Sequence, residues 1–98
     1  MTQEELDKAE HFTADYYGLD RQMNILQEEC AELIQAVSKV RRYGLSREEN
    51  LIEEMADVEV MMDQIKILLN IPEDKIRDFK ITKTERELKR IQQAKKEV

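Results

Sequence analysis

The sequence predicts an all-α protein, an antiparallel bundle of about four helices that is completed by oligomerisation. Two glycines and one proline leave little material for tight turns, and the runs of β-branched and aromatic residues that are typical of strands are absent. Hydrophobic residues make up 41% and charged residues 39% of the 98 residues, which suits thin helices with one narrow apolar stripe each. Small helical proteins of this kind often complete their core by pairing with a copy of themselves.

Charge and composition exclude several classes of protein. The formal net charge is −6, with 22 acids against 16 bases, whereas binding of a nucleic-acid polymer requires a basic surface. A single cysteine, Cys30, cannot form an internal disulfide, and we therefore expect a reducing, cytoplasmic environment. The acidic N-terminus does not resemble a signal peptide, and no apolar stretch approaches the length of a membrane span, so no membrane partner is expected.

The first helix is predicted over residues 3–17. Thr2 and Glu5 have the spacing of a capping box, and Gly18 ends the helix. Its weak apolar stripe consists of Leu6, Ala9, Phe12 (or Thr13) and Tyr16. The aromatic end of the helix, Phe12, Tyr16 and Tyr17, has two interpretations: ordinary packing onto the second helix, or stacking on a nucleobase.

Two longer helices follow, one from an N-cap at Asp20 to about Arg42, and one from a capping box at Ser46 and Glu49 to about Asn70. In both, the apolar residues alternate in steps of four and three, which is the seam of a helix packed against a nearly antiparallel neighbour. The predicted seams are Leu19, Met23, Leu26, Cys30, Leu33, Val37 and Val40 in the first, and Leu51, Met55, Val58, Met62, Ile65 and Leu69 in the second. The short connection makes the two helices antiparallel neighbours.

A fourth helix is predicted over residues 72–96, with Pro72 in its first turn. A break between Lys80 and Thr84 is left open, because Thr82 and Lys83 interrupt the apolar pattern. No linker divides the chain. We therefore expect one domain over residues 1–98, with a core at 18–70 and the fourth helix at 72–96.

One eight-residue phrase occurs twice, as LQEECAEL from Leu26 to Leu33 and as LIEEMADV from Leu51 to Val58. Residues three apart share a helix face, so each copy presents a pair of acids. Each acid directly precedes a predicted seam residue, and matching flanks of two antiparallel helices can face one side of their groove. The four acids are Glu29, Glu32, Glu54 and Asp57.

Four carboxylates gathered in this way repel one another unless a cation neutralises them. Carboxylate oxygens suit Mg²⁺, and also Mn²⁺, and such a site retains room for a substrate phosphate. The repetition in the same seam register favours a metal site over a solvated helix flank. Glu28 and Glu53 lie one position further round each helix, as partners of the ligands or as additional ligands.

Glu29-Cys30-Ala31-Glu32 followed by Glu54-Met55-Ala56-Asp57 resembles the ExxE…ExxD signature of the MazG-like all-α nucleoside triphosphate pyrophosphohydrolases. This superfamily includes dimeric dUTPases and phosphoribosyl-ATP pyrophosphohydrolase. The resemblance covers residues 18–67. It implies Mg²⁺-dependent hydrolysis of a (deoxy)nucleoside triphosphate to monophosphate and pyrophosphate, by a homodimer or homotetramer. The four acids would be the metal-binding catalytic residues, with Glu28, Glu53 or a ligand as the base.

Phosphate binding also requires cations, and the candidates are Lys39 near the end of the helix predicted from Asp20 to Arg42 and Lys80, Lys83 and Arg86 on the fourth helix. The latter resemble basic residues that many family members carry after the motif helices. The alternative function is a non-catalytic helical oligomerisation or interaction module, which the small size of the chain and its plain fourth helix favour. Base and sugar preference, the number of metal ions and the oligomer size stay open at this level.

Overall fold

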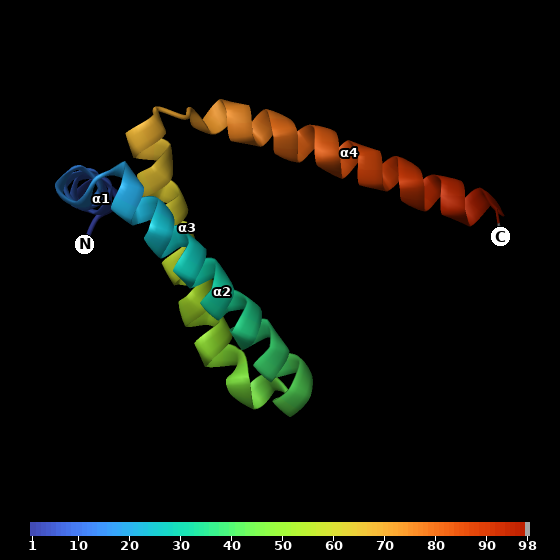
Figure 1. The fold of residues 1–98 in the computed structure, drawn as a ribbon. Helices are drawn as coiled ribbons and strands as arrows, with labels where there is room; N and C mark the ends of the chain where they lie inside the picture. The colour runs from blue at the N-terminus through green and yellow to red at the C-terminus, as the bar shows by residue number, and fades with distance from the viewer. Residues whose placement is uncertain (98) are drawn as a thin grey trace.

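The computed structural model describes residues 1–97, which form four α-helices and no strand (Figure 1). They are α1 (Gln3–Tyr17), α2 (Leu19–Tyr43), α3 (Glu48–Leu69) and α4 (Glu73–Glu97), with a short 3₁₀ helix, η1 (Leu45–Arg47), before α3. The prediction of an all-α bundle of four helices is confirmed. None of the described helices combines the length and the apolar character that crossing a bilayer requires.

Helix α1 begins at the predicted capping box. The backbone N–H of Glu5 donates to Thr2 Oγ1 (3.1 Å), and the backbone N–H of Thr2 donates to Glu5 Oε1 (3.3 Å). Its packing differs from the prediction. Glu10 and Ala14 are the buried residues of α1, whereas Phe12 and Tyr16 are 74% and 73% exposed. The predicted apolar stripe is therefore wrong, because Ala14 allows a close approach to the hairpin that the bulky rings would prevent.

Glycines make both sharp turns around α2. Gly18 (φ 82°, ψ 167°) and Gly44 (φ 87°, ψ −169°) occupy a backbone region that is almost restricted to glycine. Since Gly18 turns the chain directly from α1 into α2, helix α2 already begins at Leu19. The predicted N-cap at Asp20 is wrong, because that residue lies inside the first turn of the helix.

The start of α3 also differs from the prediction. Residues Leu45–Arg47 form η1, so Ser46 lies before the helix and does not cap it. Its Oγ instead donates to the backbone carbonyl of Tyr43 at 3.5 Å. Arg47 is the N-cap and makes no side-chain capping bond. The predicted capping box is therefore absent, since η1 moves the N-cap of α3 by one residue, from Ser46 to Arg47.

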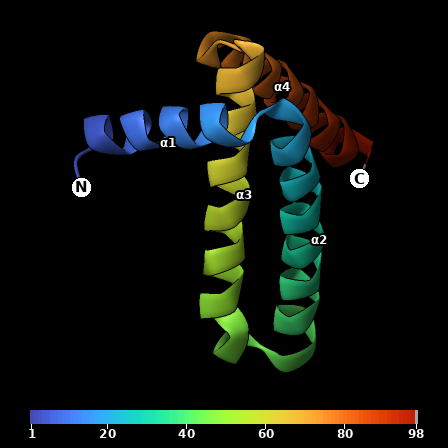
Figure 2. The same ribbon diagram turned by 60° about the vertical axis from the view of Figure 1, so that its left-hand side comes forward.

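Helices α2 and α3 form the antiparallel hairpin that was predicted, and α1 crosses one end of it (Figure 2). Alternate positions of the predicted seams are half-buried, as expected: Leu19, Leu26, Leu33 and Val40 on α2, and Leu51, Val58 and Ile65 on α3. At the positions between them, the residue before the predicted one lies inside instead. Met55 and Met62 are 51% and 42% exposed, whereas Glu54 and Met61 lie further inside. On α2, Cys30 is likewise exposed and Glu29 is half-buried. The first acid of each pair, Glu29 on α2 and Glu54 on α3, thus lies on the contact face itself. The sequence had predicted these two acids at the flank of that face.

The end of the hairpin under α1 has a polar core. Gln22 and Gln64 are both buried, and Gln22 Nε2 donates to Gln64 Oε1 at 2.6 Å. Arg21 Nη1 donates to Gln22 Oε1 at 2.8 Å, and its guanidinium lies 3.7 Å from the centroid of the Tyr17 ring. These bonds satisfy the buried amides and hold α1 and α3 against the start of α2.

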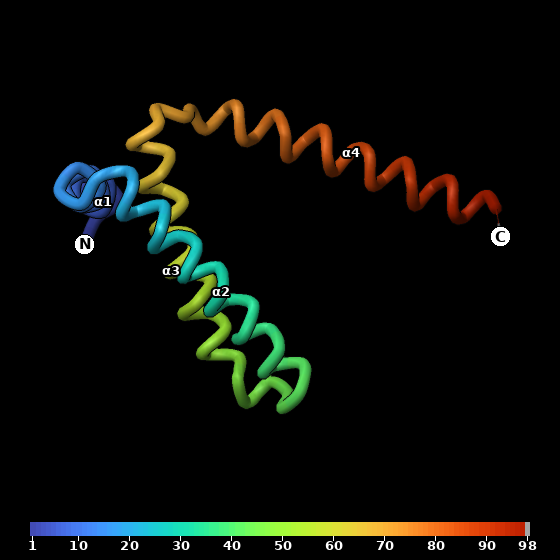
Figure 3. Tube along the Cα trace, in the orientation of Figure 1, coloured from blue at the N-terminus to red at the C-terminus, as the bar shows by residue number. Residues whose placement is uncertain are grey.

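Helix α4 is continuous through the region where a break was left open, and it extends away from the hairpin (Figures 1 and 3). It is joined to α3 by Lys66, whose Nζ lies 2.7 Å from Glu73 Oε1 and 3.7 Å from Asp63 Oδ1. The hydrogen bond that Lys66 donates to Glu73 raises the pKa of Lys66 above its ordinary value, so the lysine stays charged.

This arrangement leaves an unusually large surface uncovered. The radius of gyration is 17.4 Å, against about 13 Å for a compact domain of this length. The accessible surface is 8235 Å², against about 5,900 Å² for a compact monomer of this mass. The described chain alone therefore does not enclose a core of ordinary size.

The backbone at Gly44 yields a test of the hairpin turn. Gly44→Ala should lower the free energy of unfolding by about 1–3 kcal/mol, because alanine is strained at this φ and ψ even though nothing lies within 4 Å of the added Cβ. Urea denaturation followed by circular dichroism measures the change. Ser38→Ala, on the exposed side of α2, should stay within about 0.5 kcal/mol of the wild type. Equal stability of the two variants would contradict the strain at Gly44.

Candidate metal centre

The two copies of the repeated phrase face each other across the α2–α3 hairpin. Each helix contributes one pair of acids, and one oxygen from each of four carboxylates lies within 4.8 Å of the other three. The four residues are Glu29 and Glu32 of α2 and Glu54 and Asp57 of α3. The prediction that these four side chains converge is therefore confirmed. It follows from the spacing, because three residues bring both acids of a pair to one side of each helix.

The cluster has an inner and an outer half. Glu29 and Glu54 are half-buried on the contact face, whereas Glu32 and Asp57 are exposed at the edge of the hairpin. Oε2 of Glu29 and Oε2 of Glu54 are shielded from solvent and have no hydrogen-bond partner among the described residues. A buried carboxylate oxygen without a donor is costly, so these two atoms call for a proton or a cation.

The electrostatics of the cluster agree with its geometry. Burial, followed by the charges of Glu32 and Asp57, raises the pKa of Glu29 to about 6. The same causes raise the pKa of Glu54, and the charge of Glu53 adds to them. The carboxylates therefore repel one another in the absence of a counter-charge. An acidic cluster that could hold a metal ion is present, and hard divalent cations such as Mg²⁺ and Mn²⁺ prefer this set of oxygen donors.

The other predicted site residues are not brought into this cluster. Glu28 and Glu53 are exposed, and each directly precedes an acid of the cluster, Glu29 or Glu54. Lys39 is exposed on α2, seven residues or about 10 Å along the helix from Glu32. The basic residues Lys80, Lys83 and Arg86 lie on α4, which extends away from the hairpin, so within one chain they do not reach the carboxylates (Figure 1).

The aromatic candidates lie on α1, at the end of the hairpin. Tyr16 and Tyr17 contact each other edge to face with their ring centroids 4.9 Å apart, and Arg21 covers the Tyr17 ring. Phe12 and Tyr16 remain exposed and are free to stack on another molecule. Gln22, which anchors this end of α2, lies seven residues or about 10 Å along the helix from Glu29.

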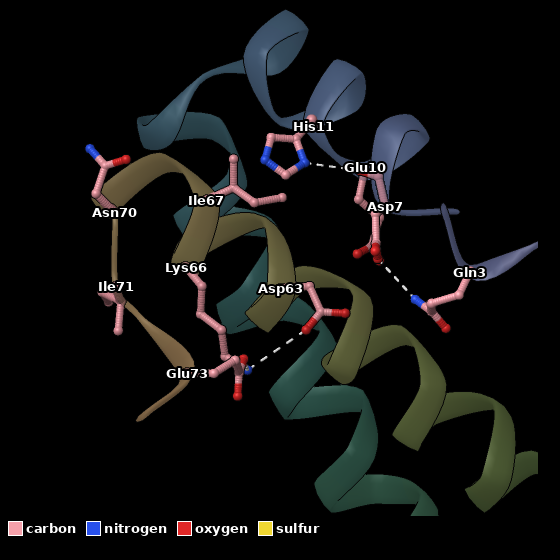
Figure 4. A pocket seen from close by; sticks show the side chains of 10 residues that line it. All are labelled: Gln3, Asp7, Glu10, His11, Asp63, Lys66, Ile67, Asn70, Ile71 and Glu73. Carbon is pink, nitrogen blue, oxygen red and sulfur yellow. Dashed lines mark hydrogen bonds and ion pairs between the residues drawn. The ribbon is translucent and has the colours of Figure 1, made fainter. Parts of the chain in front are cut away.

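A second polar region, which the sequence analysis missed, lies between α1, α3 and the start of α4. A cavity of about 490 Å³ is lined there by acids from three helices, among them Glu10, Asp63 and Glu73 (Figure 4). The sequence contained one indication of this region, because Glu10 and Ala14 are four residues apart and share one helix face. The predicted stripe followed the larger apolar side chains instead and did not include Glu10.

Comparisons of the chain with protein-family models, with curated proteins and with solved structures yield no match. What can be said of the site therefore rests on its own geometry.

The convergence of the carboxylates predicts a metal-dependent stability. In EDTA, Glu54→Gln should raise the melting temperature by a few degrees, because it removes a charge from a repulsive cluster. In Mg²⁺ or Mn²⁺ the order should reverse, since the wild type gains stability from the bound ion and the variant gains less. Differential scanning fluorimetry across a metal titration measures both effects.

The matched control for this experiment is Glu49→Gln, which makes the same charge change at an exposed position of α3 outside the cluster. It should follow the wild type in EDTA and in metal. Equal responses of Glu54→Gln and Glu49→Gln would show that the cluster does not hold a divalent ion.

Proposed function

We propose that this protein is a Mg²⁺-dependent nucleoside triphosphate pyrophosphohydrolase, which cleaves a (deoxy)nucleoside triphosphate to the monophosphate and pyrophosphate. One observation carries the proposal: four carboxylates from two antiparallel helices converge, and two of their buried oxygens have no partner. The resemblance of the two acidic motifs to those of the MazG-like superfamily supports the same reaction.

The residues present fit a divalent ion. Glu29 and Glu54 would hold it from inside the hairpin, and Glu32 and Asp57 from the exposed edge, where a triphosphate has access. Bound Mg²⁺ supplies charge neutralisation for the triphosphate and electrostatic stabilisation of the departing pyrophosphate. Because α2 and α3 are rigid and directly packed, the protein side of the site is pre-organised.

The protein's own part in the reaction is positioning and proton transfer. A carboxylate beside the phosphate can accept the proton of the attacking water, and Glu28, Glu53 and the four cluster acids are the groups near enough to do so. Phe12 and Tyr16 offer exposed rings for a nucleobase. Lys39 is the candidate for phosphate on the hairpin itself.

A homo-oligomer, either a dimer or a tetramer, is the second part of the proposal. Exposed apolar residues repeat every seven positions on each helix of the hairpin, a spacing that produces a continuous stripe. On α2 they are Met23, Cys30 and Val37, and on α3 they are Met55, Met62 and Leu69. Since each residue is rotated by about 100° from the one before it, this apolar row and the exposed acids lie on opposite edges of the hairpin.

A second copy would cover this row and reduce the excess of accessible surface. It would also provide a position for α4, on which Phe79, Ile81, Leu88 and Ile91 are exposed. In such an assembly, Lys80, Lys83 and Arg86 of one subunit can approach the carboxylates of another. The basic residues that one chain keeps away from its own cluster would then contribute to phosphate binding.

The second candidate function is an oligomerisation module without catalysis. The separation of α4 from the carboxylate cluster favours it, because a site without cations beside the phosphates is incomplete. The two functions differ in their products, since only the enzyme releases pyrophosphate.

Pyrophosphate release tests the proposed reaction. With Mg²⁺ and a panel of ribo- and deoxyribonucleoside triphosphates, the wild type should release pyrophosphate from at least one nucleotide. Glu54→Gln should lower the rate by about 100-fold or more with its helical circular dichroism unchanged, because one charge at the reaction centre is lost. Glu49→Gln should keep the wild-type rate. If no nucleotide is cleaved and no metal raises the melting temperature, the proposed reaction is contradicted and the oligomerisation module without catalysis is the function that is left.

The apolar row predicts the oligomeric state. Light scattering coupled to size exclusion should give a mass of two or four chains for the wild type. Met62→Glu should shift it towards the monomer, because it buries an unpaired charge in the proposed contact. Ser38→Glu, on the outer side of α2, should leave the mass unchanged. A wild type that is monomeric at micromolar concentration would contradict the proposed interface.

A further inference from the structure

The contact between α1 and α3 contains a pair of acids that the proposed reaction does not use. Glu10 of α1 is only 8% exposed, and its carboxyl group is in hydrogen-bonding contact with that of Asp63 on α3. Glu10 and Ala14 are the two residues that α1 buries against the hairpin. One of the two residues that α1 buries is therefore an acid that faces another acid.

The basic groups near Glu10 do not outweigh the repulsion that it experiences. The charge of His11 lowers the pKa of Glu10, but burial and the charges of Asp63 and Asp7 raise it by more. On α3, Lys66 lies 2.7 Å from Glu73 of α4 and only 3.7 Å from Asp63. On α1, His11 Nδ1 donates to the backbone carbonyl of Asp7 at 2.9 Å, and the Asp7 carboxylate accepts from Gln3 at 2.9 Å. On α2, Arg21 is bound to Gln22 and Tyr17.

Two carboxyl groups in direct contact are stable when they share one proton and repel each other when both are ionised. Burial, and then the charge of Asp63, raises the pKa of Glu10 to about 7. Both side chains line the cavity of about 490 Å³ between α1, α3 and α4, through which solvent and protons have access (Figure 4).

We propose that Glu10 and Asp63 form a proton-operated latch that fastens α1 to α3 in acidic solution and weakens as the pH rises to neutrality. The sign follows from linkage. A Glu10 that has left the contact titrates near 4.5, whereas in the docked helix it keeps its proton up to about pH 7. Undocking therefore releases a proton between these values, and the docked state loses stability as the pH rises through this window. Because α1 carries Phe12 and Tyr16, the latch also controls where these rings are presented.

Hydrogen exchange of the full chain tests the latch, in EDTA so that the carboxylate cluster of α2 and α3 binds no metal. After correction for the intrinsic exchange rate, protection of residues 3–17 should fall by about tenfold between pH 6 and pH 8. Protection of the middle of α2 and α3 should not follow this change. Glu10→Gln should abolish the pH dependence and keep α1 protected at pH 8, because the amide donates to Asp63 without a titrating proton.

Asp15→Asn is the matched control, since it removes a charge from an exposed position of the same helix. It should retain the wild-type pH dependence, whereas Asp63→Asn should lose it like Glu10→Gln. Protection of α1 that is independent of pH in the wild type, or that still falls in Glu10→Gln, would overturn the latch. Neither result bears on the metal centre, whose test is pyrophosphate release.

Discussion

Repulsion between carboxylates is the constraint on which the structure of this protein depends. Four of them converge on the α2–α3 hairpin, and the two inner ones present buried oxygens without a donor. Ordinary helix pairs bury aliphatic side chains at such positions, because an unpaired anion destabilises the contact. The carboxylates therefore lower the stability of the hairpin at its centre, and a cation bound there would restore it and link ligand binding to folding.

This cost also explains how the rest of the hairpin is organised. A small rotation of each helix from the predicted seam brings Glu29 and Glu54 inward and leaves Cys30, Met55 and Met62 exposed. An apolar row is thereby left for a partner on the edge opposite the exposed acids. The same small rotation thus produces a candidate metal centre and a candidate subunit interface.

Polar contacts, more than apolar ones, determine where the outer helices lie. α1 is held by Arg21 of α2 over the Tyr17 ring and by Glu10 against Asp63, and α4 is held by Lys66 and Glu73. Directional bonds of this kind define an orientation even where little apolar surface is buried. They also make α1 sensitive to protonation, since one of its two buried contacts involves a titrating pair.

The sequence by itself determined the four helices, the Thr2–Glu5 capping box and the meeting of the two acidic phrases. All of these depend on local propensity and on residue spacing, which the order of residues specifies directly. It did not determine the N-caps of α2 and α3 at Gly18 and Arg47, the buried face of α1 or the direction of α4. Only the tertiary structure decided these features, because a one-residue rotation of a helix changes which neighbour a side chain meets without changing the apolar period. Glu10 illustrates the difference: its neighbours in sequence describe an exposed acid, whereas Ala14 brings it against Asp63, 53 residues away.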